Sequence, residues 1–271
     1  MPTLDVPGAR LSYEVRGSGP VLVVVGSPMS AAHFEGVAAA LAEHHTVITT
    51  DPRGIANSPL DDPSVDVPVD RRADDLVLIL DAVGADTADV FGSSGGAITG
   101  LSLVARHGDR VRTLVAHEPP LLMLLPDADA QWAGSQDVVA TYHREGAGPA
   151  FGKFMVQAGF VGDDSGAPTG PPEPAEQAPP SEQDLRDAER FLAHDLLVTV
   201  GYRPDVEALR AASSRVVLGL GAESGHLLTQ RTTVAVANLL GTEPVIFPGD
   251  HGGFLEAPAE FAEALSKVLA G

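Results

Sequence analysis

The chain has 271 residues, 44% of them hydrophobic, and its 37 acidic residues outnumber 17 Lys plus Arg to give a formal net charge of −20. This length suits one full α/β domain with room for an insertion, and no apolar run approaches the roughly 18 residues that span a bilayer. The acidic surplus would repel phosphate backbones and anionic membrane surfaces, so we expect neither nucleic-acid nor membrane partners.

The first residues, Met1 to Asp5, lack the basic head and apolar stretch of a secretory signal, so the sequence favours a cytoplasmic protein. The absence of cysteine excludes disulfides and thiolate metal sites. Nothing in the sequence indicates the oligomeric state.

Short apolar runs alternate with longer segments of helical period along the chain, which predicts parallel strands joined by helices. The expected strands cover residues 11–16, 21–25, 46–50, 88–91, 111–116, 216–220 and 245–247. The expected helices cover residues 31–43, 69–83, 95–107, 229–240 and 258–270. Runs such as Val21 to Val25 do not alternate with polar residues, which is typical of strands buried on both faces. The predicted fold is therefore α/β, with a mostly parallel, twisted sheet flanked by helices.

This regular alternation stops after the strand that follows the helix at 95–107. We expect residues 1–118 and 215–271 to form the α/β core, and residues 119–214 to form a helical cap inserted into it. Within the cap, residues 163–180 hold six prolines and two glycines, which predicts a mobile loop. Ser181 is the expected N-cap of the helix that follows.

The pattern G-x-S-x-G falls between an apolar strand and a helix, with Ser94 at its centre. A nucleophile on such a sharp turn needs small neighbours, which Gly92 and Gly96 supply. Ser93 is out of register, because Phe91 stands two residues before it. A glycine-rich phosphate cradle is the alternative interpretation, but neither the Walker pattern nor G-x-G-x-x-G is present.

With this motif the sequence resembles the α/β-hydrolase superfamily over nearly the whole chain apart from the cap. The segment 51–58 is similar to the D-x-R-G-x-G-x-S turn of that family, with Ala56 in place of the second glycine, and we interpret Asp51 and Arg53 as structural. The resemblance implies that the base is His251, which lies between the last strand and the final helix. Loops at the carboxyl ends of parallel strands gather at one edge, so His251 can meet Ser94.

The acid that orients the histidine is ambiguous in the sequence. The family's usual position, after the penultimate strand, holds Ser224, and Glu223 stands one residue before it. Glu118 follows the strand after the nucleophile helix, where some haloalkane dehalogenases place their acid. We favour Glu118 and keep Glu223 as the alternative, with Asp250 or no acid as further possibilities.

Attack on an ester carbonyl places negative charge on its oxygen, which backbone N–H groups can stabilise. The expected donors are Gly95, directly after the nucleophile, and Ser27, in a Gly-Ser-Pro turn where relatives often carry H-G-x-P. Met29, Phe34, Trp132 and Phe154 are the expected substrate-pocket residues, and His117 and His226 are further candidates to line the site.

These residues predict a serine hydrolase that cleaves a small-molecule carboxylic ester or lactone through an acyl-enzyme on Ser94. The reaction requires no metal and no organic cofactor. Serine at this position argues against dehalogenation and epoxide opening, for which relatives use Asp. Perhydrolysis of the haloperoxidase type, C–C bond hydrolysis, a small-molecule-binding protein and a structural or partner-docking protein remain as alternatives.

Overall fold

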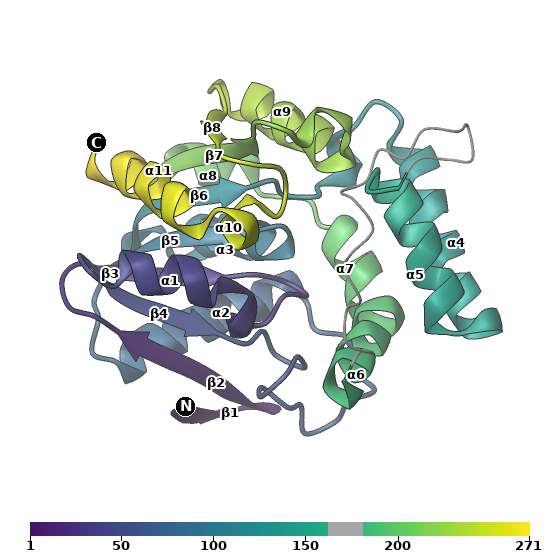
Figure 1. Ribbon diagram of the computed structural model, residues 1–271, viewed down its shortest axis with the longest axis horizontal. Coiled ribbons are helices and arrows are strands. Elements are labelled where there is room, and N and C mark those ends of the chain that lie inside the picture. Colours follow the sequence, from purple (N-terminus) through teal and green to yellow (C-terminus); the bar gives the residue numbers. More distant parts are fainter. Residues whose placement is uncertain (162–180) are drawn as a thin grey trace.

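A computed structural model describes residues 1–161 and 181–271, so the loop expected at 163–180 lies outside the described residues. Within that part of the chain, eight strands form one sheet in the order β1-β2-β4-β3-β5-β6-β7-β8 (Figure 1). The strands are β1 Thr3–Val6, β2 Ala9–Arg16, β3 Val21–Val25, β4 Thr46–Thr50, β5 Ala88–Ser93, β6 Val111–His117, β7 Arg215–Gly221 and β8 Val245–Phe247. The predicted α/β fold with a mostly parallel sheet is confirmed.

The first strand, β1, is the one that the sequence did not predict. It pairs antiparallel with β2, and β2 pairs antiparallel with β4, whereas every neighbouring pair from β4 to β8 is parallel. All four residues of β1 are exposed or only partly buried. An edge strand of this kind lacks the apolar run that marks a buried strand.

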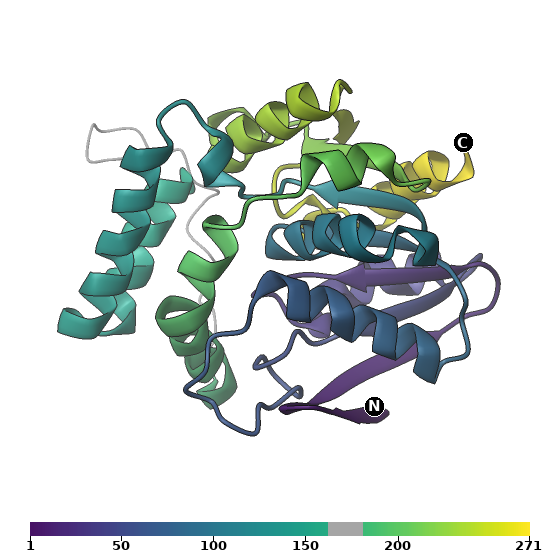
Figure 2. The same cartoon turned by 180° about the vertical axis from the view of Figure 1, so that it is seen from behind.

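Helices cover both faces of the sheet, and each face has its own apolar core. On one face lie α1 Glu35–Leu41, α10 Gly253–Glu256 and α11 Pro258–Ala270, seen in front of the sheet in Figure 1. On the other lie α2 Val69–Ala82, α3 Gly95–His107 and α9 Leu228–Leu240, with α2 and α3 in front in Figure 2. Along β3, Leu22 and Val24 enter the first core and Val23 and Val25 the second. This arrangement explains why β3 has an uninterrupted apolar sequence.

Between β6 and β7 the described chain forms α4 Ala128–Glu145, α5 Ala147–Ala158, α6 Glu182–Arg190, α7 Leu196–Val200 and α8 Val206–Ala211. Helices α4 to α7 stand at one end of the sheet (Figure 1). Ser181 caps α6 as expected, since its hydroxyl accepts from the N–H of Asp184. In contrast, α8 packs against α3, and its Leu209 belongs to a sheet core. The end of the segment 119–214 thus packs with the core rather than with α4 to α7. No helix in the described ranges is long and apolar enough to cross a membrane.

The turn at residues 51–58, near the carboxyl ends of the strands, is held by hydrogen bonds and by an ion pair. Asp51 accepts hydrogen bonds from the backbone N–H groups of Ala31 and Asn57 at 2.8 and 3.1 Å. Arg53 and Asp75 form a buried ion pair. Ala56 adopts a φ of 47°, a left-handed conformation that glycine adopts more easily. These contacts agree with the structural interpretation of Asp51 and Arg53.

Candidate active site

Ser94 occupies a sharp turn between β5 and α3. Its φ of 57° and ψ of −124° lie outside the conformations that non-glycine residues prefer. A Cβ on Gly92 would come within 2.5 Å of the Gly96 carbonyl oxygen, and one on Gly96 within 2.2 Å of the Val25 carbonyl oxygen. The flanking glycines are therefore required by close packing. They allow a turn that carries the serine at the carboxyl end of the sheet.

His251 and Glu118 meet at this same edge. The Nδ1 atom of His251 lies 2.7 Å from Oε2 of Glu118, whose side chain is fully buried. Two further groups fix the carboxylate: the N–H of Gly221 donates to Oε1 at 2.9 Å, and the Thr229 hydroxyl donates to Oε2 at 2.7 Å. With three hydrogen bonds, this carboxylate has one well-defined position.

Burial alone would raise the pKa of Glu118, but the hydrogen bond and charge of His251 outweigh it and lower the pKa to about 2. The carboxylate is therefore ionised at neutral pH. An ionised carboxylate on Nδ1 keeps the Nε2 atom of His251 as the one available to act as a base, and it stabilises the imidazolium.

The other acid candidates lie in different surroundings. Glu223 is exposed to solvent. Asp250 accepts a hydrogen bond from the N–H of Gly252 at 2.7 Å, within its own turn. Ser224, at the family's usual acid position, is fully buried. Among these candidates in the described chain, Glu118 is the one whose carboxylate hydrogen-bonds to the His251 ring.

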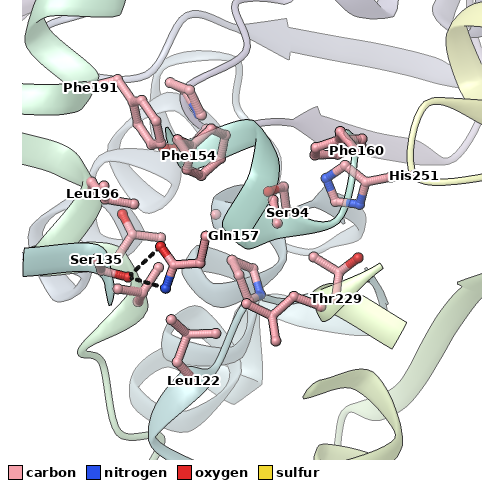
Figure 3. Close-up of a pocket in the computed structure, with 18 residues that line it drawn as sticks. Ser94, Leu122, Ser135, Phe154, Gln157, Phe160, Phe191, Leu196, Thr229 and His251 are labelled. Atoms are coloured by element: carbon pink, nitrogen blue, oxygen red, sulfur yellow. Dashed lines mark hydrogen bonds between the residues drawn. The ribbon is translucent and has the colours of Figure 1, made fainter. Parts of the chain in front are cut away.

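A pocket opens beside Ser94 and His251 with a cavity volume of about 70 Å³ (Figure 3). Its wall is mostly apolar and includes Leu122, Phe154, Phe160, Phe191, Leu196, Val200 and Leu228. Polar atoms come from Ser27, Ser135, Gln157, Thr199 and Thr229. Most of the wall belongs to the segment 119–214, so that segment shapes the space in which a substrate would lie.

Of the four expected pocket residues, Phe154 lines this cavity and the other three do not. Phe34 is fully buried and stacks on Phe254, with ring centroids 4.7 Å apart. Met29 packs against the same core, and Trp132 packs among the helices of the inserted segment, close to Gly201. The expectation is corrected for Met29, Phe34 and Trp132, because tertiary packing draws these side chains into cores.

Several pocket residues are outside the set of four expected from the sequence, although Phe160 is among the apolar residues that we expect the cap to supply. Phe160 meets the His251 ring edge to face at a centroid distance of 5.8 Å. Gln157 and Ser135 form a polar pair, with the Gln157 amide donating to the Ser135 hydroxyl at 3.1 Å (Figure 3). In the sequence, Phe160 was one of several aromatic residues without a distinguishing spacing. Ser135 lies on α4 and Gln157 on α5. Their contact depends on how these two helices pack together, which no local sequence motif predicts.

The expected oxyanion donors are both at the pocket wall, but Gly95 differs from the expectation in one respect. Its N–H donates to the Ser27 carbonyl oxygen at 3.2 Å. The first N–H groups of a helix have no partner within the helix, and the Ser27 carbonyl lies close enough to accept one from α3. The Gly95 donor is thus engaged in this conformation.

His117 lies behind the site and not in the pocket wall, while His226 is exposed. The His117 ring stacks near that of His251, with centroids 6.2 Å apart, and its other neighbours include Phe247 and Phe261. Its Nε2 atom has no hydrogen-bond partner in the part of the chain that the structure describes. Burial lowers the pKa of His117 to about 4.

This burial predicts a loss of stability in mild acid. Below pH 6.5 the unfolded chain takes up a proton on His117 while the folded chain does not, so the free energy of unfolding should fall as the pH drops from 6.5 to 4. Across this pH range, the free energy of unfolding should fall by about 3 kcal/mol because of His117. Urea denaturation at several pH values measures it, and His117→Phe should remove this part of the pH dependence. An unchanged slope in that variant would contradict the assignment.

Similarity to known proteins agrees with this geometry. A family model described as alpha/beta hydrolase fold matches residues 19–196, and the chain belongs to this family. It is 31% identical over 274 residues to the uncharacterized hydrolase YraK of Bacillus subtilis, covering 98% of this chain and 95% of that protein. The chain is a hydrolase of this fold.

Two solved structures illustrate the likeness of fold. A thermophilic esterase from Thermogutta terrifontis superposes with a TM-score of 0.73 at 19% identity, covering 99% of this chain and 96% of that one. The enol-lactonase from Burkholderia xenovorans LB400 has a TM-score of 0.64 at 18% identity, covering all of both chains. At these identities the likeness concerns the fold, and the resemblance seen in the sequence is confirmed at that level.

Proposed function

We propose that this hydrolase cleaves small, mainly apolar carboxylic esters or lactones through an acyl-enzyme on Ser94. The observation that carries the proposal is the contact between His251 and the buried carboxylate of Glu118, at the mouth of a pocket that Ser94 also lines. An esterase and an enol-lactonase among the structures of the same fold agree with this substrate class.

In the proposed reaction, the Ser94 oxygen attacks the carbonyl carbon while His251 takes its proton. The carbonyl electron pair moves to oxygen, and its return expels the alcohol, which receives the proton from His251. Water then attacks the acyl-enzyme with the same proton transfers and releases the acid. Glu118 stays ionised and stabilises the imidazolium. Backbone N–H groups of Ser27 and Gly95 are the proposed oxyanion donors, and Gly95 would have to exchange its bond to the Ser27 carbonyl for one to substrate.

The pocket predicts a preference for short acyl groups. Phe154 and Phe191 close one side of the cavity, with ring centroids 5.0 Å apart. Truncation by Phe154→Ala should enlarge the space and shift the optimum of kcat/KM to longer p-nitrophenyl esters, by about tenfold between acetate and hexanoate, as expected for the burial of a few methylene groups. Phe151→Ala is the matched control, since Phe151 is exposed and does not line the pocket. The same chain-length profile in both variants would contradict this prediction.

A panel of p-nitrophenyl esters and lactones, together with labelling by a fluorophosphonate probe, tests the proposal. We expect turnover of short neutral substrates and rapid labelling that His251→Ala abolishes. Absence of both would instead favour a binding protein that has kept the fold. A preference for polyanionic substrates would overturn the proposed substrate class, and turnover seen only with hydrogen peroxide or with diketones would assign perhydrolysis or C–C hydrolysis.

A further inference from the structure

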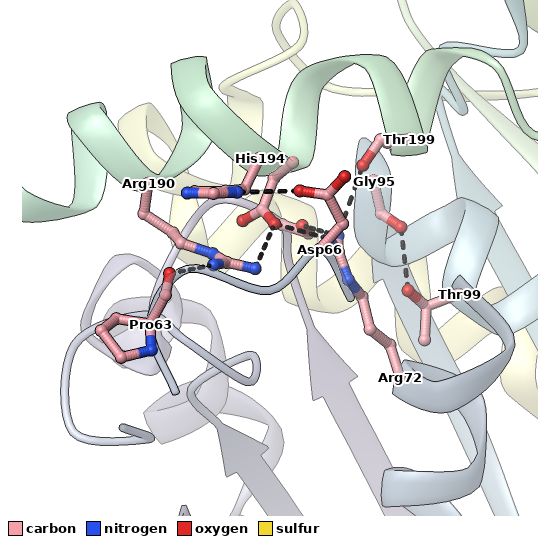
Figure 4. Close-up of polar contacts among 10 residues, drawn as sticks. Pro63, Asp66, Arg72, Gly95, Thr99, Arg190, His194 and Thr199 are labelled. Atoms are coloured by element: carbon pink, nitrogen blue, oxygen red, sulfur yellow. Dashed lines mark hydrogen bonds and ion pairs between the residues drawn. The ribbon is translucent and has the colours of Figure 1, made fainter. Parts of the chain in front are cut away.

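A buried arginine forms hydrogen bonds with residues of the pocket wall. Arg72, on α2, is 5% exposed, and its guanidinium reaches both the core and the inserted segment (Figure 4). Its Nη1 donates to the hydroxyls of Ser27 at 3.0 Å and Thr199 at 3.3 Å, and its Nη2 donates to Asp195 at 2.8 Å. The interpretation from the sequence included no role for Arg72.

The charges around Arg72 do not cancel. Asp195 is 1% exposed, and its Oδ1 also lies 3.3 Å from Nη2 of Arg190, so two guanidinium groups share one carboxylate. The nearby carboxylate of Asp75 is paired with Arg53. The group of Arg72, Arg190 and Asp195 thus has a formal charge of +1. In a buried environment, such a charge polarises the groups that it contacts more strongly than it would in water.

The chemistry of the guanidinium fixes the direction of the hydrogen bond to Ser27. Arginine can only donate, so the Ser27 oxygen must accept, and the hydrogen of that hydroxyl is left to point in another direction. Ser27 lines the pocket together with Ser94. Its Cβ lies 3.0 Å from the position that a Cβ on Gly95 would occupy, which places it beside the residue after the nucleophile.

We propose that the Ser27 side-chain hydroxyl is a catalytic residue that donates a hydrogen bond to the oxyanion, and that Arg72 is the positioning residue that orients and polarises it. The inference rests on the proposed function. As Ser94 attacks, the carbonyl electron pair moves to oxygen, and the Ser27 O–H donates to that oxygen without giving up its proton. The hydroxyl supplements the backbone donors, of which Gly95 N–H is engaged with the Ser27 carbonyl.

Kinetics of p-nitrophenyl acetate hydrolysis and inhibition by trifluoroacetone test this proposal, because the ketone forms an adduct with Ser94 that carries the oxyanion. We expect Ser27→Ala to lower kcat by about 10- to 100-fold, somewhat less than the loss of a principal oxyanion donor. KM should change little, and the affinity for the ketone should fall by the same factor as kcat/KM. A role limited to packing would not produce this parallel loss.

Arg72→Met should cause a similar loss of kcat, and Arg72→Lys, which keeps the charge, should restore part of it. In the double variant Ser27→Ala with Arg72→Met, the losses should not multiply, since both changes remove the same hydrogen bond. Arg112→Met is the control, because Arg112 pairs with the buried carboxylate of Asp89 near the start of β5 and neither residue lines the pocket. It should leave kcat and ketone affinity unchanged.

Three outcomes would overturn the inference: wild-type kcat in Ser27→Ala, losses in the double variant that multiply, or a loss seen in Thr199→Val instead of Ser27→Ala. If Arg72→Met does not fold, Ser27→Ala and Arg72→Lys still decide the matter. Failure of the proposed function itself looks different, because the wild type would then neither hydrolyse the ester nor react with the fluorophosphonate. Labelling of Ser94 in the Ser27→Ala variant keeps the two cases apart.

Discussion

Ser94→Ala is expected to lower kcat for ester hydrolysis by about 10⁴- to 10⁶-fold, the range seen when the nucleophile of a serine hydrolase is removed. The reason is chemical: alanine has no oxygen with which to form the acyl-enzyme. Residual turnover would come from the oxyanion donors and from substrate binding. Steady-state kinetics with p-nitrophenyl acetate and intact-protein mass spectrometry after fluorophosphonate treatment measure both turnover and adduct formation.

Ser93→Ala is the matched control for this experiment. Ser93 is the adjacent residue, is fully buried, and has its hydroxyl 3.5 Å from Nδ1 of His117 rather than in the pocket. It should keep both the labelling and most of the activity. Adduct formation in Ser94→Ala, or its loss only in Ser93→Ala, would refute the assignment of the nucleophile.

Glu118→Gln is expected to lower kcat by up to about 10⁴-fold, as in serine hydrolases in which an amide replaces the acid. The amide cannot stabilise the imidazolium, and its NH₂ group favours the wrong tautomer of His251. Glu223→Gln should retain the wild-type kcat, because Glu223 is exposed. The kinetics of the two glutamine variants, measured side by side, check this. Loss of activity in Glu223→Gln alone would reverse the assignment.

The pKa of Glu118 adds a prediction about pH to this comparison. Because its folded pKa of about 2 is below the ordinary value of 4.5, the group stabilises the folded state above pH 4.5. This contribution is lost as the pH falls through about 2. Between pH 5 and 9 the charge of Glu118 is constant, so any acidic limb in the pH–rate profile within this range belongs to another group.

The sequence predicted the parts of the structure that local patterns encode. An uninterrupted apolar run located β3, and the small glycine neighbours of Ser94 indicated the sharp turn there. The sequence did not reveal β1, whose stability comes from pairing with β2 and not from its own burial.

The candidate site was less predictable wherever it depends on contacts between distant segments. Glu118 and Glu223 both follow parallel strands, and only the folded chain distinguishes them. Gly221 and Thr229 donate hydrogen bonds to Glu118, whereas Glu223 is exposed to solvent. The aromatic residues show the same limit. Composition cannot distinguish Phe34, which stacks in a core, from Phe154, which faces the cavity.

The position of Glu118, directly after β6, has a consequence for protein engineering. If the orienting carboxylate comes from the residue after β6, the turn at residues 222–226 after β7 carries no reacting group. Its two ends still hold Glu118 in place, through the N–H of Gly221 and the hydroxyl of Thr229. The N–H groups of Ala222 and Glu223 donate to the carbonyl oxygens of Phe247 and Gly249, in the loop that leads to His251, and Ser224 is buried. A foreign peptide could therefore be grafted within this turn at the exposed residues Gly225 and His226, which leaves the contacts to Glu118 and to the His251 loop in place.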